Sequence, residues 1–112
     1  MDTQPTIGKI TIAPEVLETT ARLTTLAVPG VARMAPLTGV PRLLRQNGVG
    51  IEIVENRVRV TLHVVAEPDT SMLSVGRQIQ AEVARVIRDM IGMEVLSIDV
   101  HIEDVAYPSE RA

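Results

Sequence analysis

Cysteine, phenylalanine and tryptophan are absent from this sequence of 112 residues, and Tyr107 is its only aromatic residue of the Phe, Trp and Tyr class. The absence of cysteine excludes disulfides and thiolate metal sites and agrees with a cytosolic location. The hydrophobic core must therefore come from Val, Ile, Leu, Ala and Met. RNA binding on a sheet face is disfavoured too, because such faces stack bases on aromatic rings.

The sequence also lacks any run of roughly 18 consecutive apolar residues, the length that a membrane-spanning helix requires. Residues 1–9 contain no basic segment followed by an apolar one, so no secretory signal is predicted. We expect a cytoplasmic protein that does not span a membrane. The net charge of −3 argues against a general nucleic-acid binder. The length predicts a single domain, 1–112, with an ordered core at about 7–106 and an irregular loop at 36–48.

An amphipathic helix is predicted from about Ser71 to Ile91. Its apolar residues recur at steps of three and four and form one stripe: Met72, Val75, Ile79, Val83, Val86 and Met90. Ser71 is a candidate N-cap, and Gly92 can adopt the left-handed conformation that closes a helix. Gly76 lies inside the helix at a cost of about 1 kcal/mol relative to alanine. We interpret it as a point of close packing against a sheet, with a ligand contact as the alternative.

Two alternating runs, residues 49–53 and 58–64, predict a β-hairpin around Glu55 and Asn56. One register places the apolar residues of both runs on the same face and pairs opposite charges on the other. In that register Ile53 lies opposite Val58, Ile51 opposite Val60 and Glu52 opposite Arg59. Glutamate is a poor residue for positive φ, so we expect Asn56 to adopt it in a bulged turn.

The remaining segments complete an α+β fold. Residues 7–12 alternate as a strand does, a helix is expected from Pro14 to about Val28, and residues 31–35 predict a second short strand. The last strand places one set of residues on its buried face: Leu96, Ile98, Val100 and Ile102. The predicted order is β-α-β-β-β-α-β, with a mostly antiparallel sheet and two helices packed on one face.

No catalytic pattern is present in the sequence. None of the serines lies in a nucleophile elbow, and there is no Walker-type or dinucleotide-binding glycine pattern. We therefore predict that the protein is not an enzyme and has no cofactor. The candidate metal ligands are Asp99, His101 and Glu103 on one face of the last strand, together with His63. An exposed strand face gives the same alternation, and we favour that interpretation.

The irregular segment from Pro36 to Gly48 contains the candidate partner-binding residues. These are Val40, Arg42, Leu43, Leu44 and Arg45. Apolar and arginine side chains together on a loop are suited to docking a partner or a membrane surface. The alternative is a surface loop whose leucines pack beneath it.

Short stretches along nearly the whole chain resemble the alkaline shock protein family, which are bacterial envelope stress response proteins. In the last third they are Ile79-Gln80, Val83, Asp89-Met90-Ile91-Gly92-Met93, Val95 through Ile102, and Asp104-Val105. Upstream they are Gly8-Lys9-Ile10, Ile12-Ala13-Pro14-Glu15-Val16, Pro29-Gly30-Val31 and Gly48-Val49. The resemblance implies a non-catalytic cytoplasmic protein of envelope homeostasis that self-associates into a homo-oligomer. It also implies a peripheral place at the membrane through a separate anchoring protein.

The sequence is also compatible with two other functions. The predicted element order is also used by amino-acid-sensing modules, so a regulatory domain that binds a small molecule is one alternative. The resemblance implies a second, because family members are often encoded beside lipid- or dihydroxyacetone-kinase-like enzymes. The chain would then be an accessory subunit of such an enzyme.

Overall fold

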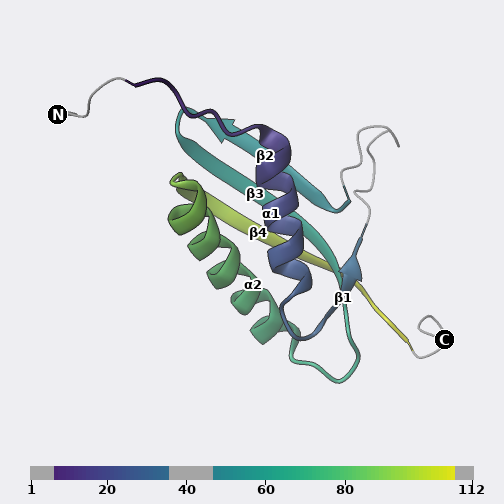
Figure 1. The fold of residues 1–112 in the computed structure, drawn as a ribbon. Helices are drawn as coiled ribbons and strands as arrows, with labels where there is room; N and C mark the ends of the chain where they lie inside the picture. The colour runs from purple at the N-terminus through teal and green to yellow at the C-terminus, as the bar shows by residue number, and fades with distance from the viewer. Residues whose placement is uncertain (1–6, 36–46, 108–112) are drawn as a thin grey trace.

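The computed structural model describes residues 7–35 and 47–107, and these form an α+β fold (Figure 1). The elements are α1 (Pro14–Leu26), β1 (Val31–Met34), β2 (Val49–Val54), β3 (Arg57–Ala66), α2 (Met72–Val86) and β4 (Glu94–Val105). One π-helical turn, Ile87–Ile91, continues α2. The predicted fold class is confirmed, but the order is α-β-β-β-α-β, without a strand before α1 in the described residues.

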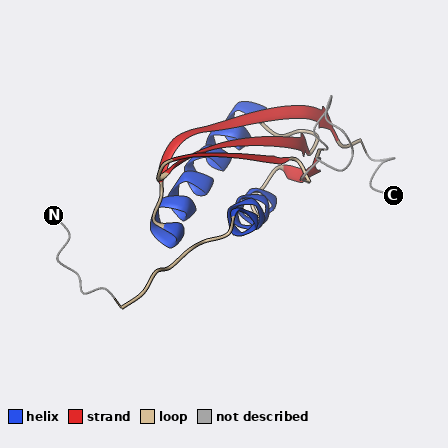
Figure 2. Ribbon diagram, turned by 90° about the horizontal axis from the view of Figure 1, so that it is seen from above, coloured by secondary structure: helices blue, strands red, loops and turns tan. Residues whose placement is uncertain are grey.

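The prediction of a strand at residues 7–12 was wrong. Residues 7–13 form an extended segment, here called the N-terminal arm, which runs away from the body of the molecule (Figures 1 and 2). Ile7 and Ile10 in this arm are 93% and 94% exposed. A strand exists only where a neighbouring strand satisfies its backbone groups, and the described part of the chain places none beside the arm.

β3 is the central strand of the sheet. On one side it pairs antiparallel with β2 through its first half and with β1 through its second half. On the other side it pairs with β4, and this pair is parallel because α2 carries the chain back to the starting end of β3. β4 therefore lies at the edge, with no described strand on its outer side. Both helices cover one face of the sheet and leave the other face open (Figure 2).

The predicted hairpin register is confirmed residue by residue. The structure pairs Ile53 with Val58, Ile51 with Val60 and Glu52 with Arg59. The prediction for the turn was wrong, because Glu55 and not Asn56 adopts positive φ, at 59°. Val54 pairs with Arg57, so only two residues remain for the turn, and the first of them takes the left-handed conformation.

Replacing Glu55 with glycine is expected to raise the free energy of unfolding by about 0.5–1 kcal/mol. Glycine adopts positive φ without the strain of roughly 1–2 kcal/mol that a side chain brings. The lost ion pair with Arg57, 3.9 Å between two exposed side chains, contributes little. Urea unfolding measures the change, with Glu52→Gly on the adjacent strand as a control that should lose stability. A lower free energy of unfolding in Glu55→Gly would contradict the claim that Glu55 is strained.

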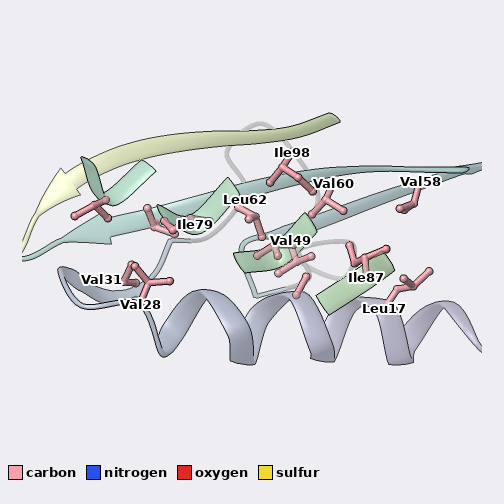
Figure 3. Packing of buried hydrophobic residues seen from close by; sticks show 14 residues of the cluster. Leu17, Val28, Val31, Val49, Val58, Val60, Leu62, Ile79, Ile87 and Ile98 are labelled. Atoms are coloured by element: carbon pink, nitrogen blue, oxygen red, sulfur yellow. The ribbon is translucent and has the colours of Figure 1, made fainter. Parts of the chain in front are cut away.

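The core between the helices and the sheet is aliphatic (Figure 3). Leu17 of α1, Ile79 of α2 and Leu62 of β3 are all fully buried within it. α2 begins where predicted, since the Ser71 hydroxyl accepts a hydrogen bond from the Ser74 N–H at 3.3 Å. The helical segment closes at Gly92, whose φ is 81°. Ser71 and Gly92 therefore mark the two ends of the helical segment.

The apolar stripe of α2 departs from the prediction in its last turn. Residues 87–91 form a π-helical turn, in which each turn holds more residues than in an α-helix. Met90, which the helical spacing placed on the buried stripe, is 75% exposed, whereas Ile87, four residues after Val83, is fully buried. A second departure lies in β4, where the register with β3 shifts between Val95 and Ser97. This bulge leaves Leu96 exposed instead of buried.

Candidate functional site

The open face of the sheet carries a row of polar side chains from β2, β3 and β4. At one end, the Arg59 guanidinium contacts a Glu52 carboxylate oxygen at 3.0 Å and donates to the Ser97 hydroxyl at 3.3 Å. These side chains are exposed, so their pairing contributes little to stability. This end of the open face is therefore an ordinary polar surface that contacts solvent.

The candidate metal ligands lie farther along the same face, and three of them meet. The Nδ1 atom of His63 lies 2.6 Å from the Oε2 atom of Glu103, and the rings of His63 and His101 stack with centroids 4.7 Å apart. Asp99 lies opposite Thr61, two residue pairs along the strands from the pair of His63 and His101. Within residues 7–35 and 47–107, no three such side chains are arranged to hold a metal ion. The arrangement is a histidine–glutamate pair with a second histidine stacked on it.

The contact between His63 and Glu103 is expected to contribute about 1 kcal/mol to the free energy of unfolding, because both side chains are partly buried. A double-mutant cycle with His63→Ala and Glu103→Ala measures it as the departure from additivity. Glu52→Ala combined with Glu103→Ala is the control and should be additive, since Glu52 pairs with Arg59 instead. Stabilisation by added zinc that disappears in His63→Ala would contradict this interpretation and support a metal site.

The predicted partner-binding residues lie outside the described residues. Val40, Arg42, Leu43, Leu44 and Arg45 all fall within 36–46, so their role stays a prediction. The described parts of the chain contain no helix that is both long and apolar enough to cross a membrane.

A groove of about 470 Å³ lies between the first half of α2 and β4. It is lined by Met72, Leu73, Gly76, Arg77, Gln80, Val100 and Ile102. Most of its surface is apolar, and Leu73 at its rim is 66% exposed. Gln80 donates a hydrogen bond from its side-chain amide to the Ile98 carbonyl at 3.0 Å and so anchors α2 to β4. The groove therefore offers an apolar surface directly beside the outer edge of the sheet.

Gly76 forms part of the groove and does not serve the packing that its position in the helix predicted. A Cβ atom added at Gly76 would meet no atom within 4 Å. Close packing against the sheet is therefore not the reason for glycine here, and that prediction was wrong. The sequence analysis did not predict the groove, and the glycine at position 76 was the available signal for it. The missing side chain leaves space that the groove uses.

Comparison with known proteins identifies the family. The profile of the alkaline shock protein 23 family, described as having a cell envelope-related function, matches residues 2–107. The chain is also 26% identical over 117 residues to the uncharacterized protein YqhY of Bacillus subtilis (strain 168). That alignment covers 98% of this chain and 87% of YqhY. The resemblance to the alkaline shock proteins is thereby confirmed.

Among solved structures, the fold is similar to that of the MamM CTD. A zinc form of a MamM CTD variant matches with a TM-score of 0.61 and 16% identity, covering 83% of this chain and 87% of that one. A copper form of another variant matches with a TM-score of 0.60 and 16% identity, covering 82% of this chain and 98% of that one. At this identity the likeness concerns the fold alone.

Proposed function

Because the chain belongs to the alkaline shock protein 23 family, whose function is cell envelope-related, we propose that it is a non-catalytic cytoplasmic protein of the envelope stress response. It acts through contacts with other proteins and through self-association. Its place at the membrane is peripheral and depends on a protein that anchors it.

The observation that carries this proposal is the apolar surface left uncovered along one edge of the domain. The groove beside β4 is bordered by Met72 and Leu73, both exposed, and it adjoins a strand edge without a described neighbour. Ile7 and Ile10 of the N-terminal arm are exposed as well. Apolar side chains gathered beside an unpaired strand favour association, because contact removes them from water and completes the backbone hydrogen bonds.

The same groove supports a second candidate function, a regulatory domain that binds a small molecule. Its volume of about 470 Å³ lies in the range of ligand pockets, and Arg77 and Gln80 add polar groups to an apolar lining. A ligand at roughly 100 times its dissociation constant would stabilise the fold by about 2.7 kcal/mol. A thermal-shift screen of metabolites tests this candidate.

The main proposal is tested by recovering the tagged protein from its native lysate, membrane fraction included, and identifying what co-purifies by quantitative mass spectrometry. A membrane protein recovered in stoichiometric amount, together with untagged copies of the chain, is the expected result. Recovery of a kinase-like enzyme instead would favour an accessory subunit. Recovery of neither partner nor untagged copies would contradict the proposal.

A further inference from the structure

We propose that the N-terminal arm of one copy of this chain pairs with the outer edge of β4 in a second copy. The arm would add a strand to the second copy's sheet and fill the groove beside α2. This inference rests on the self-association in the proposed function and gives it a surface.

The arm has the pattern of a strand but has no described strand beside it. Residues 7–12 alternate as a strand does, yet in the described structure they run free, and Ile7 and Ile10 face solvent. β4, in turn, spans Glu94–Val105 and pairs only with β3 among the described strands. One copy therefore offers a strand-forming segment and a strand edge that both lack a neighbouring strand among the described residues, and a second copy can bring them together. The Ile98 carbonyl already accepts from Gln80, so the arm would pair with β4 beyond it, at Val100 and Ile102.

The faces of the arm match the two faces of β4. In an extended chain Ile10 and Ile12 point to one side, and Lys9 points to the other. Beside β4, the side toward the helices is the apolar groove, lined there by Val100 and Ile102. The two isoleucines would enter this groove.

The other face of β4 supplies complementary charge. It presents the carboxylates of Asp99 and Glu103, the second of which contacts His63 on the open face of the sheet. With Ile10 and Ile12 in the groove, Lys9 would lie on this acidic side. Lys9 is the only lysine in the chain, and it lies in the arm.

The arm of the same copy is poorly placed to fill its own groove. The arm joins α1 at Pro14, which lies near Ile51 of β2, on the far side of β3 from β4. α1 and α2 run in opposite directions (Figure 1), so the arm leaves near the end of α2, whereas the groove lies along its beginning. About six extended residues span about 20 Å, and the 15 residues of α2 alone extend over about 22 Å. The arm would have to turn back along the whole length of α2 to reach the groove of its own copy. It can reach the groove of a second copy without turning back.

The variants that test the pairing use equal substitutions at equally exposed positions. Ile10→Ser is expected to weaken self-association of the full chain at least about tenfold, because a buried isoleucine is lost from the groove. Ile7→Ser removes the same side chain from the opposite face of the arm and should change association less than about threefold. Sedimentation velocity over a concentration series measures both. Equal effects at the two positions would overturn the pairing.

A third variant fills the groove without disturbing the fold. Gly76→Leu has free space for its Cβ and replaces a poor helix former, so it should raise the melting temperature while weakening association at least about tenfold. Ala81→Leu adds a leucine side chain to an exposed position of α2 outside the groove and should leave association unchanged. Undiminished association of Gly76→Leu would overturn the use of this groove.

Cross-linking gives a direct readout of the contact. An equal mixture of ¹⁵N-labelled and unlabelled protein is treated with a carbodiimide, which joins amines to carboxylates. Links from Lys9 to Asp99 or Glu103 between labelled and unlabelled chains are expected. If the wild type associates but such mixed links are absent, the arm pairing is overturned while self-association stands. If the wild type is monomeric at every concentration, both the pairing and the proposed self-association are overturned.

Discussion

Leu62→Ala is expected to lower the free energy of unfolding by about 3–4 kcal/mol, a large share of the roughly 5–15 kcal/mol that keeps a domain folded. Leu62 lies at the middle of β3, the strand to which every other described strand pairs, and its side chain is fully buried between the sheet and the helices (Figure 3). Truncation removes apolar contact and leaves a cavity, because the neighbouring aliphatic side chains relax only in part.

The matched control for this variant is Leu73→Ala, the same substitution at an exposed position of α2. It should change the free energy of unfolding by less than about 0.5 kcal/mol. Both are measured by urea unfolding at low protein concentration, where association does not contribute. A loss below about 1 kcal/mol in Leu62→Ala would show that β3 is not the centre of the core.

Gly48→Ala is expected to cost about 2–5 kcal/mol of stability, from strain and overpacking together. Gly48 has φ of +80°, a conformation that costs a residue with a side chain roughly 1–2 kcal/mol. An added Cβ would also lie 2.5 Å from the carbonyl oxygen of Ala35 and 2.7 Å from that of His63. Relieving such overpacking costs about 1–3 kcal/mol more.

The backbone around Gly48 leaves little freedom for that adjustment. The Ala35 N–H donates to the His63 carbonyl, and the His63 N–H donates to the Gly48 carbonyl, each at 2.8 Å. These bonds join the ends of β1 and β2 to β3. Gly92→Ala isolates the contribution of conformation, since Gly92 has φ of +81° but no atom within 4 Å of an added Cβ. It should cost only about 1–2 kcal/mol, and equal losses in the two variants would contradict the steric contribution.

The parts of the fold that could be predicted are those where the local sequence pattern is compatible with a single structure. The hairpin register followed from the apolar alternation of β2 and β3, because a shift by one residue would expose every buried side chain. α2 followed from its stripe and from Ser71 and Gly92 at its ends. The exposure of Met90 could not be predicted, because the helical spacing gives no sign of the π-helical turn in which Met90 lies.

Residues 7–12 and Gly76 show a different limit of the sequence. Alternation in the arm predicts a strand, but a strand also requires a neighbour, and no local pattern states whether that neighbour lies in the same chain. Gly76 shows the same limit. A glycine in a helix indicates that a side chain is missing at that position, but the sequence does not tell whether a sheet or an open groove lies beside it. In both cases the missing information concerns what lies beyond the local segment.

The most direct test of the proposed function is the mass of the untagged wild-type protein in sedimentation equilibrium, from micromolar to millimolar concentration. Self-association predicts a weight-average mass that rises with concentration above the 12.2 kDa of one chain. A mass that stays at 12.2 kDa throughout would contradict it.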